Sequence, residues 1–162
     1  MKKSSHCVAV VTGANDPEGL GFGIAKALIA DGARVYFGCR LEEQVQALAQ
    51  PLESLGANAR AVQLDVSDPD SIARAFKRIG SESPQLDILV NNAGDGANCP
   101  AMKESVIQWD RIMAVNARGS FLCSQAAAQL MLMHRYGRIV NISSQAASVA
   151  IANHVAYSCS KA

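Results

Sequence analysis

Short apolar runs alternate along the chain with longer stretches in which apolar residues recur every three or four positions. The runs predict buried strands near 7–12, 33–39, 59–64, 86–90 and 137–142. The longer stretches predict helices near 20–31, 41–55, 69–80 and from about 156 onward, and over 105–134 either one helix or two that meet near Asn116. Such alternation is typical of consecutive βαβ units. The sequence therefore predicts one α/β domain over residues 1–162, a doubly wound parallel sheet of the Rossmann type between two helical layers.

A glycine-rich turn connects the first predicted strand to the first predicted helix. Its glycines permit a tight turn and let backbone N–H groups at the helix N-terminus approach a pyrophosphate, where the helix dipole favours anions. A strand before the turn and a helix after it are the context that this mechanism requires. The candidate cofactor-binding residues in this turn are Gly13, Gly19, Leu20 and Gly21.

Near the end of the chain, Tyr157 and Lys161 are four residues apart in the last predicted helix, so their side chains share one face. A positive charge about 4 Å from a phenol, in an effective dielectric of about 20, favours the ionised phenol by roughly 4 kcal/mol. Tyr157 is therefore a candidate proton donor at neutral pH. Ser144 lies thirteen positions earlier (157 − 144). It can polarise the same oxygen if the fifth strand and the last helix face a common pocket.

The segment NISS, followed at this distance by YSCSK, resembles the active site of the classical short-chain dehydrogenase/reductase family. Members of that family exchange a hydride between nicotinamide and a carbonyl or alcohol. The resemblance covers nearly all of the chain. It implies that Tyr157 protonates the substrate oxygen, that Ser144 hydrogen-bonds it, and that Lys161 favours the ionised tyrosine and binds the nicotinamide ribose. It also implies that Asn116 holds a relay water beside Lys161.

The same resemblance assigns the adenosine side of the cofactor. It implies that Asp65 accepts a hydrogen bond from the exocyclic amine of adenine, and Ser67 or Asp68 remains free to cap the following helix. The segment NNAG, directly after the fourth strand, is expected to line the ribose. The residues assigned in this way are Asp65, Val66, Asn92, Ala93 and Gly94, with Tyr157 and Lys161 at the nicotinamide end.

Cofactor choice is set at the end of the second predicted strand, where an acid binds the 2′-hydroxyl of NAD and an arginine accommodates the 2′-phosphate of NADP. The sequence has Cys39 and then Arg40, which favours NADP(H) over NAD(H). Glu18 argues the other way, because many NADP-preferring relatives carry a basic residue there. The loop from Gly13 to Gly19 is two residues longer than the family pattern, so its phosphate contacts stay open.

Composition changes this picture little. With 49% hydrophobic residues, 18% charged residues and a net charge of +1, the chain gives no electrostatic argument for nucleic acid or an anionic membrane. The basic start MKKSSH is followed by an apolar run too short for a signal peptide. Five cysteines without a CxxC pair suit a reducing cytosol better than disulfides or zinc. We expect a cytoplasmic protein without a metal, acting on a small carbonyl or alcohol, and a homo-oligomer in its full-length form.

The family fold continues beyond the features found here. A doubly wound fold has a sixth strand, and the resemblance implies a seventh and a loop that closes over the substrate. The sequence stops at Ala162, which predicts the N-terminal part of a family member, as a fragment or a truncated reading frame. A sheet that ends after the fifth strand exposes an apolar edge, and a helix of about two turns is marginal alone. We therefore expect low stability and weak turnover.

Three functions remain open from the sequence. The first is an NADP-dependent oxidoreductase acting on a 3-oxoacyl group, a ketone or a sugar alcohol. The second is a nucleotide-binding module or sensor without catalysis, against which the complete set of Ser144, Tyr157 and Lys161 argues. The third is an enoyl reductase, suggested by the long glycine loop and disfavoured by the narrow spacing of Tyr157 and Lys161. His154 fits either a substrate pocket or a solvated loop.

Overall fold

Five strands form one parallel sheet in the computed structural model, which describes residues 7–162. The segment MKKSSH, whose signal-peptide character was considered above, lies outside the described residues. The strand order is β3-β2-β1-β4-β5, so the chain moves outward from β1 on one side and then returns to continue on the other. This confirms the predicted doubly wound sheet. The strands are β1 (Val8–Thr12), β2 (Arg34–Cys39), β3 (Ala59–Gln63), β4 (Ile88–Asn91) and β5 (Arg138–Asn141).

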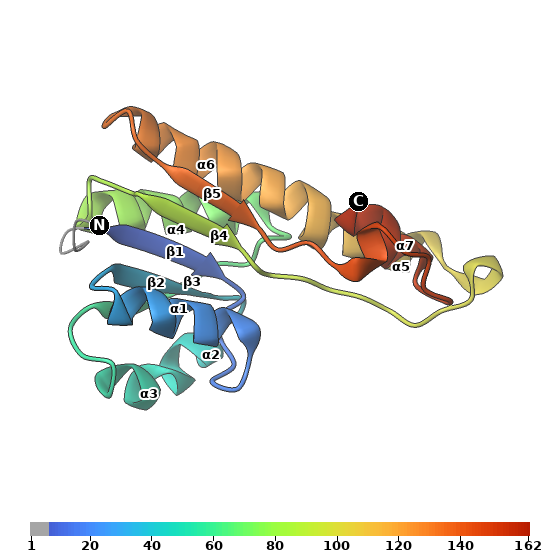
Figure 1. The fold of residues 1–162 in the computed structure, drawn as a ribbon, viewed down its shortest axis with the longest axis horizontal. Helices are drawn as coiled ribbons and strands as arrows, with labels where there is room; N and C mark the ends of the chain where they lie inside the picture. The colour runs from blue at the N-terminus through green and yellow to red at the C-terminus, as the bar shows by residue number, and fades with distance from the viewer. Residues whose placement is uncertain (1–6) are drawn as a thin grey trace.

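Helices cover both faces of the sheet (Figure 1). On one face lie α1 (Leu20–Ala30), α2 (Glu42–Ala47) and α3 (Ala49–Glu53), and on the other α4 (Pro69–Glu82), α5 (Val106–Met113) and α6 (Ser120–Leu132). The helix α7 (Val155–Lys161) ends the chain beyond β5. Two 3-10 turns, η1 (Ala101–Lys103) and η3 (Gln145–Ala147), and a π-helical segment, η2 (Ala114–Gly119), complete the elements. In the described part of the chain, no helix has the length and apolar character needed to cross a membrane.

The central strand β1 divides the hydrophobic core into two layers. Val8 and Val10 pack in the cluster that includes α4 and α6, whereas Ala9 and Val11 pack in the cluster that includes α1 and α3. A parallel strand covered on both faces has this continuous apolar sequence. All five strands run in parallel within this core, so their carboxyl ends meet at one edge of the sheet.

Two predicted helices differ in detail from the observed ones. The stretch 41–55 is two short helices that meet at Leu48, which is 1% exposed. Pro51 accounts for the break, because proline has no N–H and its ring clashes with the carbonyl of residue i−4 in a continuous helix. The stretch 105–134 stays helical from Val106 to Leu132 but passes through the π-helical turn that contains Asn116. The predicted break is thus a change of helix type.

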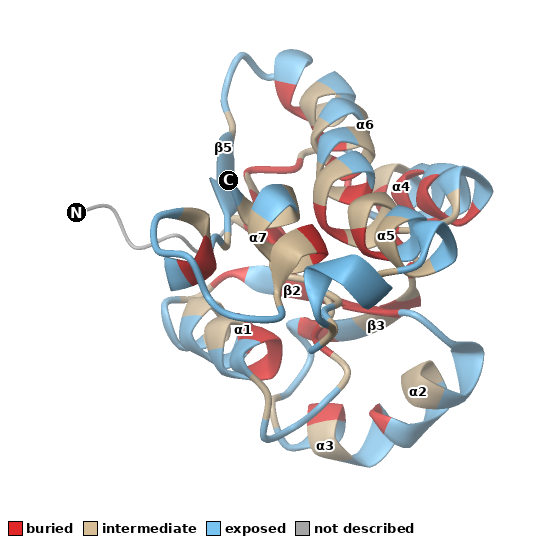
Figure 2. Ribbon diagram, turned by 90° about the vertical axis from the view of Figure 1, so that its right-hand side faces the viewer, coloured by how far each residue is buried: buried red, intermediate tan, exposed pale blue. Residues whose placement is uncertain are grey.

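The strand β5 forms an open edge. Among residues 7–162 it pairs with β4 alone, and all four of its residues are exposed, as the pale blue ribbon of β5 in Figure 2 shows. An exposed strand with unpaired N–H and C=O groups is a template for pairing with another chain. The edge therefore predicts self-association.

A lysine in place of Val140, which is 46% exposed on β5, should reduce concentration-dependent self-association, because charged side chains blunt an open edge. Sedimentation velocity over a range of concentrations measures the effect. The matched control is Met102→Lys, which changes an apolar side chain 97% exposed away from the sheet. If the two variants associate as strongly as the unmodified chain, the edge is not the contact.

Candidate active site

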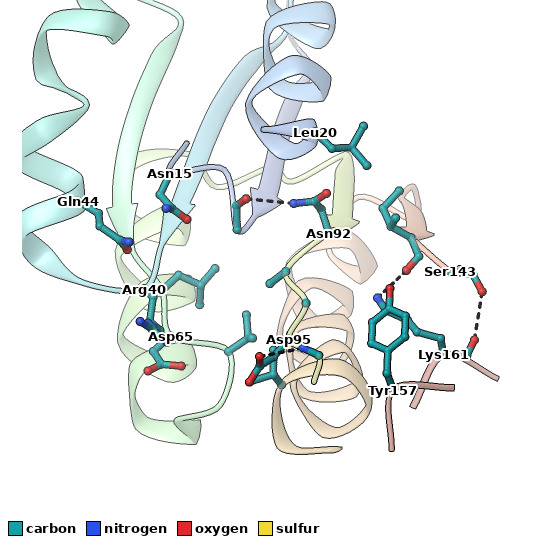
Figure 3. Close-up of a pocket in the computed structure, with 18 residues that line it drawn as sticks. Asn15, Leu20, Arg40, Gln44, Asp65, Asn92, Asp95, Ser143, Tyr157 and Lys161 are labelled. Atoms are coloured by element: carbon teal, nitrogen blue, oxygen red, sulfur yellow. Dashed lines mark hydrogen bonds between the residues drawn. The ribbon is translucent and has the colours of Figure 1, made fainter. Parts of the chain in front are cut away.

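A cleft of about 700 Å3 runs along the carboxyl ends of the strands. Residues that directly follow each of the five strands line it, and Tyr157 and Lys161 of α7 join them (Figure 3). Open α/β sheets bind ligands in the crevice outside the carboxyl ends of their strands, at the point where the strand order reverses. The cleft lies at that point. It is lined by Gly13, Asn15, Leu20, Arg40, Gln44, Leu64, Asp65, Val66, Asn92, Ala93, Gly94, Asp95, Gly96, Val115, Ile142, Ser143, Tyr157 and Lys161.

The glycine turn and the loop after β4 are locked together at the floor of the cleft. Asn92 donates from Nδ2 to the carbonyls of Thr12 (2.9 Å) and Gly13 (3.0 Å), and the buried hydroxyl of Thr12 accepts from the N–H groups of Asn92 and Ala93. Gly13 has a φ of +64°, and a Cβ there would lie 2.8 Å from Cα of Ala93. A Cβ at Gly21 would lie 2.5 Å from Nδ2 of Asn92. The predicted glycines are thus required by close packing of the two loops.

The lengthened glycine loop contains a small turn from Asp16 to Gly19. Asp16 accepts hydrogen bonds from the N–H of Glu18, at 3.0 Å on Oδ1, and from the N–H of Gly19, at 2.8 Å on its carbonyl. Gly19 is the N-cap of α1 and supplies no side-chain cap. The N–H groups at the start of α1 are therefore left for a ligand. Glu18 is exposed and is not among the residues that line the cleft.

The adenosine end of the cleft carries a cation next to a neutral thiol. Arg40 is exposed and lines the cleft. Cys39 is fully buried and donates from Sγ to the carbonyl of Phe37, and burial raises the pKa of its thiol to about 12. Asn15 and Gln44 also line this end, and both are drawn above Arg40 in Figure 3. Sequence reasoning did not identify them, because neither belongs to a motif.

Asp65 lines the cleft but is partly committed to its own loop. Its Oδ1 accepts from the N–H of Ser67 (2.9 Å) and from the Ser67 hydroxyl (2.7 Å). Asp68, which the sequence indicated alongside Ser67 as a possible helix cap, is the N-cap of α4 and accepts a hydrogen bond from the N–H of Asp70. Asp65 therefore keeps Oδ2 for a ligand, and Val66 beside it is 6% exposed.

The amide of Asn116 joins three segments beside the other end of the cleft, although Asn116 is not among the residues that line the cleft. Its Nδ2 donates to the carbonyl of Asp95 (2.8 Å) and to Oγ of Ser160 (2.7 Å), and its Oδ1 accepts from the N–H of Asp95 (2.8 Å). Asp95 is held in turn by the N–H of Gly96 and by an ion pair with Nε of Arg111 at 3.2 Å. Asn116 is 5% exposed. It fixes the loop after β4, the π-helical turn and α7 against one another.

The carbonyl of Asn116, inside the π-helical turn, accepts a hydrogen bond from Oγ of Ser120 at 2.8 Å. A hollow of about 440 Å3 borders Asn116 and Lys161, and Asn91 also lines it. Within the described residues, Oδ1 of Asn91 is buried without a hydrogen-bond partner. Orphaned buried oxygens of this kind suit ordered water. The relay water next to Asn116 stays a prediction that this geometry allows.

Tyr157 and Lys161 both extend from α7 to the cleft, as Figure 3 shows. Nζ of Lys161 donates to the carbonyl of Ile142 at 2.9 Å, which ties α7 to the end of β5. The loop after β4 lies close to both side chains. A Cβ at Gly94 would lie 3.6 Å from Nζ of Lys161, and one at Gly96 would lie 3.2 Å from Cδ2 of Tyr157.

The two serines after β5 are placed differently from each other. Ser143 lines the cleft and donates from Oγ to the carbonyl of Lys161 at 3.1 Å. Ser144 is the N-cap of η3, accepts from the N–H of Ala146 at 3.2 Å, and is not among the residues that line the cleft. This cap uses a lone pair of Ser144 and leaves its hydroxyl proton free. Its role toward substrate stays a prediction.

Comparison with known proteins identifies the family of the chain. The family model for short chain dehydrogenases matches residues 7–162. The chain belongs to the short-chain dehydrogenase family. It is 41% identical over 154 residues to a D-threitol dehydrogenase of Mycolicibacterium smegmatis, which is 95% of this chain and 58% of that protein. It is 35% identical over 155 residues to the 3-oxoacyl-(acyl-carrier-protein) reductase of Escherichia coli, or 96% of this chain and 62% of that protein.

Solved structures give the same family likeness. A metagenomic short-chain oxidoreductase in complex with NADP has a TM-score of 0.87 and 36% identity, and the match covers 96% of this chain and 70% of that one. A gluconate 5-dehydrogenase of Burkholderia cenocepacia in complex with NADP and tartrate has a TM-score of 0.89 and 29% identity, over 96% and 60% of the two chains. The chain thus spans about 60% of the length of the curated relatives that it matches.

The cleft fits the nicotinamide dinucleotide that short-chain dehydrogenases bind. The start of α1 has no side-chain cap, and Gly13 and Gly21 let the glycine turn pack closely against the loop after β4. Arg40 lies at one end of the cleft, and Tyr157 and Lys161 lie at the other. These residues therefore match a dinucleotide with its pyrophosphate at α1 and its nicotinamide at α7.

Asn116→Ala should lower the free energy of unfolding by about 2–3 kcal/mol, because it removes three hydrogen bonds and leaves buried partners unsatisfied. Urea denaturation measures this change. Asn58→Ala, at an exposed asparagine before β3, is the control and should change the free energy little. Equal effects of the two substitutions would show that the amide of Asn116 does not join the three segments.

Proposed function

We propose that the chain is the cofactor-binding and catalytic portion of an NADP-dependent oxidoreductase that acts on a ketone or the corresponding secondary alcohol. The observation that carries the proposal is the arrival of Tyr157 and Lys161 from α7 at the mouth of the cleft that also holds the glycine turn. A tyrosine with a purely structural role and a lysine that only faces solvent would not be expected to line the same cleft. The catalytic set is Asn116, Ser144, Tyr157 and Lys161.

When bound, the nicotinamide supplies the hydride that reaches the carbonyl carbon. Tyr157 donates its phenolic proton to the carbonyl oxygen, which becomes the hydroxyl of the product. Lys161 keeps one N–H on the carbonyl of Ile142 and has two others, one for the nicotinamide ribose and one that stabilises the phenolate left on Tyr157. Ser144 donates a hydrogen bond from its hydroxyl to the same substrate oxygen and keeps its proton. A water held by Asn116 returns a proton from solvent.

The preference for NADP(H) rests on the charge at the end of β2. Arg40 offers a guanidinium to the 2′-phosphate, and Cys39 is buried as a neutral thiol, so that position carries no carboxylate to bind a 2′-hydroxyl or repel a phosphate. Glu18, the residue that argued for NAD, does not line the cleft. Two structurally similar proteins were solved with NADP, which supports the same choice.

The names of similar proteins indicate a broad class of substrate. Those compared include a D-threitol dehydrogenase, a gluconate 5-dehydrogenase and a 3-oxoacyl reductase. Two of these names describe dehydrogenases of hydroxyl compounds, and the third describes reduction of a 3-oxo group. We therefore propose a ketone or secondary alcohol, either a polyol or an oxoacyl compound. A cytoplasmic location and a homo-oligomeric full-length form stay predictions from the sequence.

Tyr157→Phe should abolish NADPH-dependent reduction of ketones while leaving NADPH affinity within about twofold, because only the proton donor is removed. A spectrophotometric assay with a panel of ketones measures turnover, and NADPH fluorescence titration measures binding. Tyr136→Phe, at a tyrosine 50% exposed and far from the cleft, is the control. Turnover that persists in Tyr157→Phe would sink the assignment. Cofactor binding without any reduction by the unmodified protein would favour the nucleotide-binding module instead.

Arg40→Ala should erase the preference for NADPH. A charge-assisted hydrogen bond is worth about 1.5–3 kcal/mol, which corresponds to at least about tenfold in affinity. Titration of both cofactors into both proteins gives the ratio of dissociation constants. The control is Arg138→Ala, at the amino end of β5 and therefore at the opposite edge of the sheet. If the unmodified protein binds NADH as tightly as NADPH, Arg40 does not select the cofactor.

A further inference from the structure

A second hollow, of about 270 Å3, opens beside the ring of Tyr157. It is lined by Gly96, Ala97, Asn98, His154 and Tyr157, and it shares Gly96 and Tyr157 with the main cleft. A molecule whose oxygen reaches the hydroxyl of Tyr157 can therefore extend into this hollow. The walls offer two polar side chains, those of Asn98 and His154.

The backbone holds His154 firmly at the edge of this hollow. His154 is the N-cap of α7, and its carbonyl accepts from the N–H of Ser158 at 2.8 Å. The preceding carbonyl, of Asn153, accepts from the N–H of Cys99 at 2.7 Å, and Cys99 and His154 form an isolated parallel bridge. The loop after β4 and the start of α7 are thus joined where the imidazole projects. A group on such a support is pre-organised for a ligand.

The imidazole has one nitrogen committed and one available. Nδ1 lies 2.7 Å from the carbonyl of Ala152, and because a carbonyl oxygen only accepts, Nδ1 carries the proton. In the neutral ring Nε2 is then an acceptor. The ring also packs edge to face with Tyr157, with centroids 6.3 Å apart and an interplanar angle of 73°. His154 is therefore oriented beside the proposed proton donor and presents a lone pair.

We propose that Nε2 of His154 accepts a hydrogen bond from a hydroxyl group of the substrate, so that the site selects ketones with a hydroxyl close to the carbonyl. The proposal rests on the proposed function, because it takes Tyr157 as the group that receives the carbonyl oxygen. A plain ketone leaves Nε2 without a partner in the hollow, whereas a hydroxyketone satisfies it. Sites built to hydrogen-bond a substrate hydroxyl discriminate strongly against analogues that lack it.

The first test compares kcat/KM for 1-hydroxybutan-2-one and butan-2-one with NADPH. We expect the unmodified protein to favour the hydroxyketone by at least about tenfold. His154→Phe keeps a ring against Tyr157 but removes both nitrogens, so the ratio of the two kcat/KM values should fall to about one. His154→Gln retains an acceptor and should keep most of the preference. His134→Phe, at an exposed histidine at the end of α6, should leave the ratio unchanged.

The second test does not depend on turnover. With NADP+ present, nitrogen-15 NMR of the imidazole rings should show the Nε2 resonance of His154 moving on addition of 1-hydroxybutan-2-one and staying in place with butan-2-one. Equal shifts with both ketones, or an unchanged kcat/KM ratio in His154→Phe, would overturn the proposal. A selective shift without reduction of either ketone would support the contact while overturning the proposed oxidoreductase function.

Discussion

The buried amide of Asn116 is the contact on which the site depends. One side chain joins the loop after β4, the π-helical turn and α7 through three hydrogen bonds. Asparagine is a poor residue inside a helix because its side chain competes for backbone hydrogen bonds. Here the side-chain amide hydrogen-bonds to the loop after β4 instead of to its own helix, and the helix has a π-helical turn at this position. Such turns occur frequently at functional sites.

The parallel sheet supplies the second constraint. Because all five strands run in one direction, the residues that follow them meet at one edge, although they are spread from Gly13 to Ser143 along the chain. The helix α7 then adds the candidate proton donor from outside the sheet. The bond from Lys161 to the carbonyl of Ile142 ties this helix to the sheet edge. A short helix is marginal alone, so its position depends on attachments such as these at Ser160 and Lys161, and on the bond from Ser143 to the carbonyl of Lys161.

Much of this architecture could be predicted from sequence because buried parallel strands read as continuous apolar runs. The cleft residues that directly follow strands could also be predicted from the sequence, because glycine and asparagine motifs have fixed places in such folds. The break before Pro51 was missed although its signal was present. The contribution of Thr12, which ties the glycine turn to the loop after β4, could not be predicted. It depends on partners eighty residues away, at Asn92, and 81 away, at Ala93.

The placement of Ser143 and Ser144 is another feature that the sequence alone could not predict. Spacing along the chain indicates which serine matches the family motif, but only the turn geometry decides which hydroxyl faces the cleft. In this structure Ser144 caps a 3-10 turn and Ser143 lines the cleft. A hydroxyl that accepts from a backbone N–H can still donate its proton, so capping and catalysis by Ser144 are chemically compatible.

The central claim is that the cleft between the glycine turn and Tyr157 is where a hydride passes to a ketone. The most direct measurement uses NADPH with deuterium at both C4 positions, the protein and 1-hydroxybutan-2-one, followed by mass spectrometry of the alcohol. The account predicts one deuterium on the carbon that carries the new hydroxyl. Tight binding of this NADPH with no deuterated alcohol formed would contradict it.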